Sequence, residues 1–464
     1  MIDTKALRTK VLDLAIQGKL TKQLETDGSA KDLLDDSFIE HKNSPFQIPD
    51  TWKWVKLSDI GSTNIGLTYH PSDIDDNGTI VIRSSNIVNG KMDYSDIVKV
   101  TCSIKENQFL KTNDIVICAR NGSKALVGKN AIYYGESNKI SFGAFMAIFR
   151  TPYFKFVHLF FNTQAFRRNF SSDDSKQINQ VTQSILKESL IPLPPLAEQE
   201  RIIARTEEIF KLLDIIDESQ KKYTDDVAIL KSKLITMGIQ GKLTEQLDSD
   251  GTAEELYQQI QDEKQKLIKE GKIKKEKTLP EIKDEEIPFE IPSNWKWVRL
   301  AKIVSSLGDG LHGTPEYCEN GEYYFINGNN LCNKKIVIKS DTKRVDKNEF
   351  LKYKKELTLG TVLVSINGTL GNIAFYNNER IILGKSACYF NLIEPEMKSF
   401  IYYILKTDYY LKYAHFSATG VTIKNVSLKA MNELLIPLPP LAEQKRIAEK
   451  LDDILKIIDK QKTE

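Results

Sequence analysis

The sequence predicts a mixed α/β protein in which two similar lobes are joined by long antiparallel helices, in a circular arrangement with pseudo-twofold symmetry. Two internal repeats carry this prediction, because self-similarity at a fixed spacing indicates a repeated structural unit. The first repeat places LIPLPPLAEQ at 190–199 and 435–444, and it pairs IPDTWKWVKL at 48–57 with IPSNWKWVRL at 291–300. The second repeat pairs IQGKLTKQLETDGSA at 16–30 with IQGKLTEQLDSDGTA at 239–253.

The two repeats have different offsets and therefore divide the chain into five parts. Each lobe opens at the Trp-x-Trp motif and closes at PLPPLAEQ, and the segment between the lobes combines what recurs at the two ends of the chain. The predicted parts are an N-terminal half of the helical region at 1–43, a first lobe at 44–196, a central helical spacer at 197–286, a second lobe at 287–441 and a C-terminal half-helix at 442–464.

Each lobe is predicted to mix short strands with one amphipathic helix. The β-branched runs at 79–85, 114–119 and 361–366 are typical of strands, and glycine and asparagine near their ends favour turns. The helices are predicted at 156–166 and 400–412, where apolar residues recur at helical spacing.

The helical parts carry apolar residues at heptad spacing, which is typical of a coiled-coil seam. Because the ends of the chain repeat the halves of the central segment, we expect the terminal half-helices to pack antiparallel along the central helix, which then acts as a rigid spacer between the lobes. The predicted seam consists of Leu7, Val11, Leu14, Ile202, Ile209, Leu213, Ile216, Val227, Leu230, Leu234, Met237, Ile447, Leu451, Ile454 and Ile458.

Composition is typical of a globular protein. The 464 residues are 41% hydrophobic and 28% charged, and no apolar run approaches the roughly 18 residues of a membrane span. The N-terminus lacks the apolar block of a signal peptide, so we expect the cytoplasm. The five cysteines are scattered without a CxxC pair, which predicts neither a disulfide framework nor a zinc site. The lobes are mildly basic and the remaining segments acidic, which suits DNA-facing lobes.

Motifs of catalysis are incomplete in this chain. Gly384–Lys385–Ser386 resembles the end of a phosphate-binding loop, but Glu379 stands where the earlier glycine is required. The calcium-loop pattern that starts at Asp73 has Ser84 at the position of the bidentate glutamate. The residues around Pro194–Pro195 do not form an amino-methyltransferase motif, and the five histidines have no metal-ligand spacing. We therefore predict that the chain is not an enzyme and holds no metal or cofactor.

Taken together, the motifs resemble the specificity subunit of type I restriction–modification systems. The resemblance covers essentially the whole chain and rests on IPLPPLAEQERI (191–202), IPLPPLAEQKRI (436–447), the two IQGKLT segments, the lobe openings WKWVKLSDIG and WKWVRLAKIV, and LHGTP (311–315). It implies that each lobe is a target-recognition domain for one half of a bipartite, asymmetric site in double-stranded DNA. It also implies that the helices dock two methyltransferase subunits, and that two motor-nuclease subunits can join them. S-adenosylmethionine, ATP and magnesium would bind to those partners.

Polar residues near the predicted turns are the candidates for DNA contact, since Arg, Asn, Gln and Lys read base edges while Lys, Ser and Thr bind phosphates. Unlike lobes predict unlike half-sites. The candidates in the first lobe are Arg83, Ser84, Ser85, Asn86, Arg120, Asn121, Ser123, Lys124, Arg167, Arg168, Lys176 and Gln177, and those in the second are Asn327, Asn329, Asn330, Asn367, Thr369, Lys385, Thr419 and Lys424.

Other interpretations stay open at this point. The Asn-Gly pairs of ARNGS and SINGT are also typical of plain turns in which Gly122 and Gly368 take positive φ. Arg167 and Arg168 fit a solvated helix face equally well, and the lysine-rich stretch 264–277 fits a helix extension and linker. For the whole chain, the alternatives are a protein-binding coiled-coil scaffold that reads no DNA, or the recognition part of a fused restriction–methyltransferase.

Overall fold

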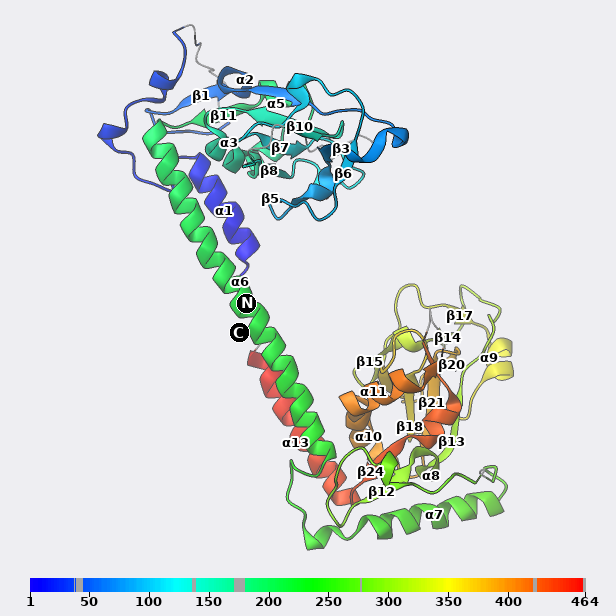
Figure 1. The fold of residues 1–464 in the computed structure, drawn as a ribbon. Helices are drawn as coiled ribbons and strands as arrows, with labels where there is room; N and C mark the ends of the chain where they lie inside the picture. The colour runs from blue at the N-terminus through cyan, green and yellow to red at the C-terminus, as the bar shows by residue number, and fades with distance from the viewer. Residues whose placement is uncertain are drawn as a thin grey trace. The chain divides into compact units, whose positions relative to one another are not determined.

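The computed structural model describes residues 1–36, 38, 45–135, 139–170, 180–275, 278–419 and 424–461. The chain forms two compact units, one over 2–221 and the other over 222–464 together with Met1. Each unit holds one lobe and one half of the 44-residue helix α6 (Leu196–Ile239) (Figure 1). None of the described helices combines the length and the apolarity that a membrane span requires.

The first lobe is closed by its own boundary motifs. Strand β1 (Lys53–Lys56) of the Trp-x-Trp motif pairs antiparallel with β11 (Leu190–Leu193), which contains the first two residues of PLPP. Between them the chain forms an antiparallel four-stranded sheet and a three-stranded sheet in which β3 and β9 are parallel. Their strand orders are β2 (Ser62–Ile65), β10 (Met146–Arg150), β7 (Ile115–Cys118), β8 (Asn130–Ile132), and β6 (Val98–Val100), β3 (Ile74–Ile82), β9 (Ile140–Phe142).

The second lobe repeats the order of these sheets and adds a two-stranded sheet of β22 (Ala418–Thr419) and β23 (Asn425–Val426). Strand β12 (Lys296–Arg299) pairs with β24 (Leu435–Leu438) as β1 pairs with β11. The larger sheets have the orders β13 (Val304–Asp309), β21 (Ala387–Leu392), β18 (Thr361–Ser365), β19 (Ile373–Phe375), and β17 (Arg344–Val345), β14 (Tyr323–Ile326), β20 (Ile381–Leu383). The predicted mixed α/β fold with two similar lobes is therefore confirmed.

The prediction of a single helix at 156–166 and at 400–412 is wrong in the extent of the helices, because each of these segments forms two helices. In the first lobe α3 (Phe154–Phe161) ends before Thr163, whose hydroxyl accepts a hydrogen bond from the Phe166 amide and begins α4 (Gln164–Arg167). Thr407 plays the same part in the second lobe. A threonine that caps a new helix start ends the preceding helix, which apolar spacing alone does not reveal. In the second lobe the pair is α10 (Lys398–Leu405) and α11 (Asp408–Ser417).

The repeated motifs meet at a joint between each lobe and α6 or its counterpart. Glu198, from PLPPLAEQ, is fully buried and accepts hydrogen bonds from the Trp52 indole at 2.7 Å and the Gln23 amide at 2.7 Å. Nearby, Arg201 forms a bidentate ion pair with Asp27 at 2.6 and 2.5 Å. The joint therefore gathers PLPPLAEQ, the Trp-x-Trp motif and the IQGKLT segment, which explains why all three are repeated.

The second unit contains the same joint. Glu443, in the first turn of helix α13 (Leu441–Gln461), is fully buried and accepts hydrogen bonds from Trp295 at 2.8 Å and Gln246 at 2.8 Å. Arg446 pairs with Asp250 through two contacts of 2.6 Å. Charged residues inside a protein are tolerated only when their polar atoms are bonded in this way.

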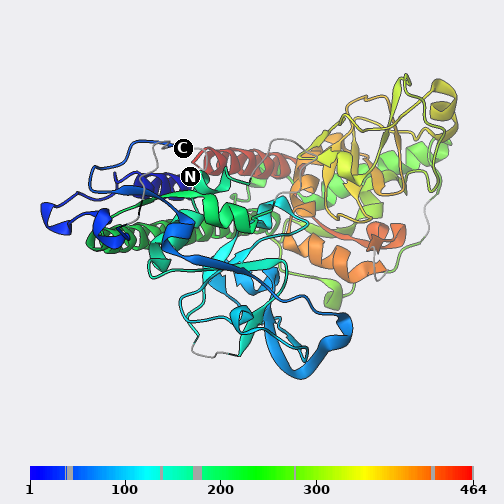
Figure 2. The same ribbon diagram turned by 90° about the horizontal axis from the view of Figure 1, so that it is seen from above.

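The terminal half-helices pack antiparallel along α6 within their units, as predicted (Figure 1, Figure 2). Helix α1 (Thr4–Ile16) runs beside the first half of α6, where Thr4 bonds to Asp217 at 2.5 Å and Arg8 pairs with Asp214 at 2.7 Å. Helix α13 runs beside the second half, where Lys231 pairs with Asp459.

The predicted seam differs from the observed one at Leu7 in α1 and at Leu230 and Met237 in α6, which are exposed. Leu7 is exposed, whereas Thr4, Leu12, Ala15 and Ile16 of α1 are buried. The reason is that α1 also packs on the first lobe, since Leu12 and Ile16 belong to the lobe's core. Of the predicted seam, Ile202, Leu213, Ile447 and Leu451 are buried, Val11, Leu14, Ile209, Ile216, Val227, Leu234, Ile454 and Ile458 are partly buried, and Leu230 and Met237 are exposed.

The lysine-rich stretch after the IQGKLT copy is in part a packed helix. Helix α7 (Ala253–Lys269) is capped by Thr252, whose hydroxyl accepts from the Glu255 amide. Lys264 is only 4% exposed and donates to the Ala301 carbonyl at 2.6 Å. This lysine therefore attaches α7 to the second lobe instead of lying in a solvated linker.

Candidate nucleic-acid interface

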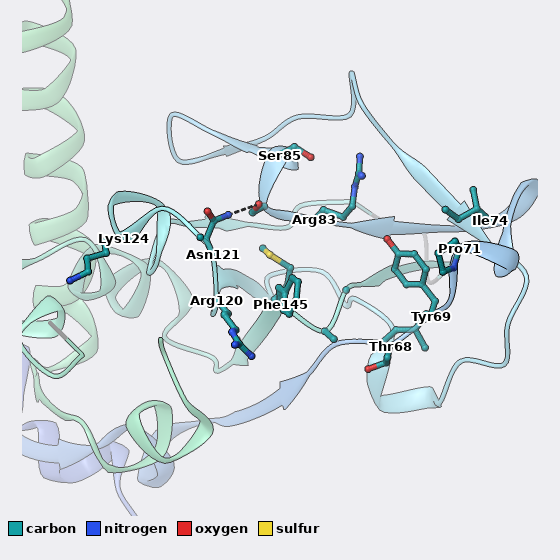
Figure 3. Close-up of a pocket in the computed structure, with 16 residues that line it drawn as sticks. Thr68, Tyr69, Pro71, Ile74, Arg83, Ser85, Arg120, Asn121, Lys124 and Phe145 are labelled. Carbon is teal, nitrogen blue, oxygen red and sulfur yellow. Dashed lines mark hydrogen bonds between the residues drawn. The ribbon is translucent and has the colours of Figure 1, made fainter. Parts of the chain in front are cut away.

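A concave surface lies where turns of the first lobe's two larger sheets converge, and the cavity that it bounds has a volume of about 1140 Å³ (Figure 3). Arg83 follows strand β3, Arg120 and Asn121 follow β7, and Phe145 lies in the turn between β9 and β10. The candidate residues that line it are Arg83, Ser84, Ser85, Arg120, Asn121 and Lys124. Six residues predicted from two separate sequence segments are thus brought to one place by the pairing of the sheets.

The polar groups of this surface are partly held in position. The Asn121 amide donates to the Ser84 hydroxyl at 3.1 Å, the dashed line in Figure 3. Arg83 is half-buried and pairs with Asp96 at 2.8 Å. Arg120 is exposed, with its guanidinium 5.9 Å from the centre of the Phe145 ring. The surface thus offers two guanidinium groups and one lysine, Lys124, to an anionic or base-edge ligand.

Apolar side chains at the surface were missed by the sequence analysis. Phe145 is 62% exposed and Ile74 is 52% exposed, and Tyr69 lines the same surface. Apolar side chains can contact the thymine methyl group or wedge between base pairs, so these residues are candidates for DNA contact beside the polar ones. The phenylalanine of GAFMA, which directly follows a glycine and an alanine, was the available indication.

Two predicted DNA contacts are corrected by the structure. Asn86 is 1% exposed, and its amide group bonds to the Arg83 backbone amide and to the carbonyls of Asp93 and Asp96. Asn330 is 5% exposed and is bonded in the same manner to Asn327 and Val337. Both asparagines hold the turn after a strand, so their side chains are committed inside the lobe.

The second lobe brings the corresponding turns together. The Ser386 hydroxyl accepts from the Gly328 amide at 2.9 Å and donates to Asn327 at 3.0 Å. The Asn367 side chain donates to Asn425 at 3.2 Å, next to Lys424. Asn329, Thr369, Lys385, Thr419 and Lys424 are exposed, whereas Asn327 and Asn367 are half-buried. Gly368 has the expected positive φ of 75°, while Gly122 stays outside that region.

The remaining first-lobe candidates lie elsewhere. Ser123 is exposed beside Lys124 but does not line the concave surface. Arg167 and Arg168 stand at the end of α4 and also do not line it. Lys176 and Gln177 lie outside the described residues. In the described part of the chain, no group of three or more His, Cys, Asp or Glu side chains is arranged to hold a metal ion. The arrangement supports recognition of a ligand by hydrogen bonds, charge and apolar contact.

Comparisons with known proteins agree with this organisation. A family model described as "Type I restriction modification DNA specificity domain" matches residues 49–223 and again 292–464. The type I restriction enzyme EcoAI specificity subunit of Escherichia coli is 25% identical over 99% of this chain and 90% of its own length. The EcoKI specificity subunit of Escherichia coli (strain K12) is 32% identical over 43% of this chain and 45% of its own length.

A solved structure shows the same fold. A chain described under "complex assembly and conformational transition of the type I R-M system" superposes with a TM-score of 0.59 at 17% identity, and it covers 90% of this chain and 94% of that chain. At this identity the likeness concerns the fold alone.

Proposed function

Since the chain belongs to the type I restriction–modification DNA specificity family, we propose that it directs a type I restriction–methyltransferase complex to a bipartite, asymmetric site in double-stranded DNA. Each lobe reads one half of the site. The observation that carries this proposal is that the two lobes share one strand topology while the turns at the same place differ chemically. The turn between the parallel strand and the next strand holds Ala144–Phe145 in the first lobe and Lys385–Ser386 in the second.

Because the two lobes share a strand topology but differ in the residues of their turns, we expect them to read different half-sites. An apolar ring beside Arg120 suits a base pair with a thymine methyl group, whereas Lys385 suits the hydrogen-bond acceptors of guanine. The frame itself is shared, so the lobes approach the duplex in the same manner and the contacted bases differ. The resulting site is asymmetric.

The helices supply the surface for partners in this proposal. Leu212 and Ile215 in the first unit are 55% and 58% exposed, and Ile229 in the second unit is 53% exposed. Exposed aliphatic residues on a long helix favour association with other helices. We propose that two methyltransferase subunits dock on the helical region and that two motor-nuclease subunits join them. S-adenosylmethionine, ATP and magnesium would bind to these subunits, this chain would hold no cofactor, and the complex would act in the cytoplasm.

The first test is the methylation pattern of DNA in cells that express this chain with its neighbouring methyltransferase. Single-molecule sequencing with and without this gene should give a gapped, asymmetric methylated motif that vanishes on deletion. A continuous motif, or methylation that persists after deletion, would contradict the proposal.

A scaffold that reads no DNA makes a different prediction. Binding of labelled duplex to the purified complex should weaken steeply as salt rises if the lobes neutralise phosphates, because counterions are released on binding. DNA affinity that does not change with salt would favour the scaffold.

A further inference from the structure

A second cavity of the first unit, about 720 Å³ in volume, lies between the lobe and the helices α1 and α6. Its walls include the hairpin of β4 (Ile87–Val88) and β5 (Lys91–Met92), together with α3. Most of the lining is apolar or aromatic, with Met92, Tyr134 and Phe210 among the larger side chains. The cavity is separate from the candidate nucleic-acid interface, since no residue lines both.

Two buried polar atoms in this cavity have no hydrogen-bond partner among the described residues. Thr206 on α6 is 5% exposed, and its hydroxyl has no partner. Nδ1 of His158 on α3, a partly buried residue, also has none. Burial lowers the pKa of His158 to about 4, so the imidazole is neutral at pH 7. Unpaired buried polar groups are rare in native proteins and indicate a missing partner.

A carboxylate stands beside them. Glu207 follows Thr206 on α6, lines the cavity and is exposed. Burial raises the pKa of the Tyr134 hydroxyl, and the negative charge of Glu207 adds to that effect, which places the carboxylate near the ring. Glu207 forms no ion pair with any residue that the structure describes.

The second unit shows what occupies the corresponding place. There Lys334 reaches from the hairpin of β15 (Leu331–Cys332) and β16 (Lys335–Ile336) to Asp452, with its ammonium 2.7 and 3.0 Å from the carboxylate oxygens. The same ammonium lies 4.9 Å from the ring centre of Tyr402 and 5.2 Å from that of Tyr403. The site is filled by an alkylammonium held by a carboxylate and two aromatic rings.

The two places are equivalent in backbone and sequence position. Gly90 in the first hairpin has φ 72° and Lys334 in the second has φ 69°, a conformation that residues other than glycine seldom adopt. Glu207 and Asp452 both stand nine positions after the buried glutamate of their joint. A Cβ atom at Gly90 would meet nothing within 4 Å. The first cavity is thus open because glycine replaces the lysine that fills the second.

We propose that the cavity of the first lobe binds a primary alkylammonium group, with Glu207 as its counter-ion and the Thr206 hydroxyl as a hydrogen-bond acceptor. The group comes from a free alkylamine or from a lysine of a bound protein, and the chemistry is the same in both cases. The inference does not depend on DNA reading, because it rests on the comparison of the two repeats.

Two lysines at the edge of the cavity bear on its charge preference. Lys91 and Lys155 both line it and are exposed. In the second unit Lys335 takes the hairpin position of Lys91, and Lys406 lies 5.7 Å from the Tyr402 ring, yet Lys334 is still bound to Asp452. Neighbouring ammonium groups therefore do not prevent binding. The position of Lys155 in the first unit is occupied by Ser399 in the second unit, where no positive charge stands at this point. We therefore expect Lys155→Ala to remove a repulsive charge and to strengthen amine binding.

The test titrates the full-length chain with n-pentylamine and compares it with 1-pentanol and pentanoate, which share the alkyl chain and differ in charge. Saturable binding should be seen for the amine, and it should be weakened about tenfold in Glu207→Gln, as expected for the loss of a charged partner. Glu218→Gln, an exposed change elsewhere on α6, is the matched control. Equal binding of pentanol or pentanoate, no saturable binding, or indifference to Glu207→Gln would overturn the proposal.

A second variant keeps the proposal falsifiable without depending on weak ligands. Gly90→Lys should place its ammonium beside Glu207, raise the melting temperature and abolish pentylamine binding, whereas Gly90→Asn, which also tolerates positive φ, should leave the cavity open. If the melting temperature of the double variant Gly90→Lys, Glu207→Gln stays as high as that of Gly90→Lys alone, the proposed ion pair is contradicted. Weaker assembly of Gly90→Lys with the methyltransferase would identify a partner lysine as the source, and unchanged assembly a free amine.

Discussion

The carboxylate of Glu198 accepts a hydrogen bond from the indole nitrogen of Trp52 at 2.7 Å, in a position where the glutamate is fully buried. Glu443 and Trp295 repeat this contact at 2.8 Å. The bond joins the first turn of a long helix to the first strand region of a lobe. Its loss would leave the indole without a partner, or would take one of several donors from a buried carboxylate, and both are costly in the protein interior.

We therefore expect Glu198→Ala to lower the free energy of unfolding of the first unit by about 3 kcal/mol, since it removes a buried charge that several donors share. Urea denaturation of the complete chain, followed by fluorescence of the tryptophans, measures this change. Glu200→Ala is the matched control, because Glu200 is exposed on the same helical turn. Equal effects of the two variants would show that the joint contributes little.

The ion pairs of the joints predict an acid-sensitive stability. Hydrogen bonding to Arg201 lowers the pKa of Asp27, and hydrogen bonding to Arg446 lowers the pKa of Asp250. A carboxyl group with a lowered folded-state pKa stabilises the fold above its ordinary pKa, and this stabilisation is lost as the pH falls through the lowered value. Melting temperatures of the wild type and of Asp27→Asn should therefore converge as the pH falls from about 3.8 through the lowered pKa of Asp27. A constant difference down to pH 2 would contradict the prediction.

His158 predicts a second dependence on pH, at milder acidity. Burial lowers its pKa from about 6.5 to about 4, so between these values the unfolded chain binds a proton that the folded chain does not. The free energy of unfolding should decline as the pH falls from 6.5 to 4. His158→Gln, which cannot be protonated, should flatten this part of the stability curve. Thermal denaturation across this range measures the slope, and an unchanged slope would show that His158 is accessible to protons when folded.

The concave surface of the first lobe predicts a defect in only one half of the DNA site. Arg120→Ala should weaken specific DNA binding by about 1–3 kcal/mol if the guanidinium contacts a base, and Phe145→Ser should relax the methylated motif in the half read by this lobe. Methylation sequencing and equilibrium binding at fixed salt measure both. Lys187→Ala, an exposed change on α5 (Gln183–Glu188), should leave them unaltered. Altered bases in both halves would contradict a division of reading between the lobes.

The second lobe offers the reciprocal change. Lys385 lies in the turn that corresponds to that of Phe145 and is exposed. Lys385→Ala should alter the other half of the methylated motif and leave the half that depends on Phe145 unchanged. A uniform loss of affinity with an intact motif would instead identify Lys385 as a phosphate contact, which carries no sequence information.

The sequence by itself determined the two-lobed mixed fold and the antiparallel half-helices, because exact repeats such as LIPLPPLAEQ reveal a repeated unit without knowledge of its shape. It did not reveal that Glu198 and Trp52 bond to each other, although both belong to recognised motifs. Contacts between residues 146 positions apart depend on how strands and helices meet, and only the tertiary structure supplies that.

Tertiary structure also decided which residues of each pattern face inward. Heptad spacing selected Leu7, yet α1 packs against a lobe as well as against α6, so Leu12 and Ile16 are buried and Leu7 is exposed. Asn86 was predicted to contact DNA because of its residue type, but its side-chain amide forms hydrogen bonds within the turn that contains Ser84. The exposure of the Phe145 ring and the open place at Gly90 follow only from the tertiary structure, since the surroundings of a side chain are set by segments distant in sequence.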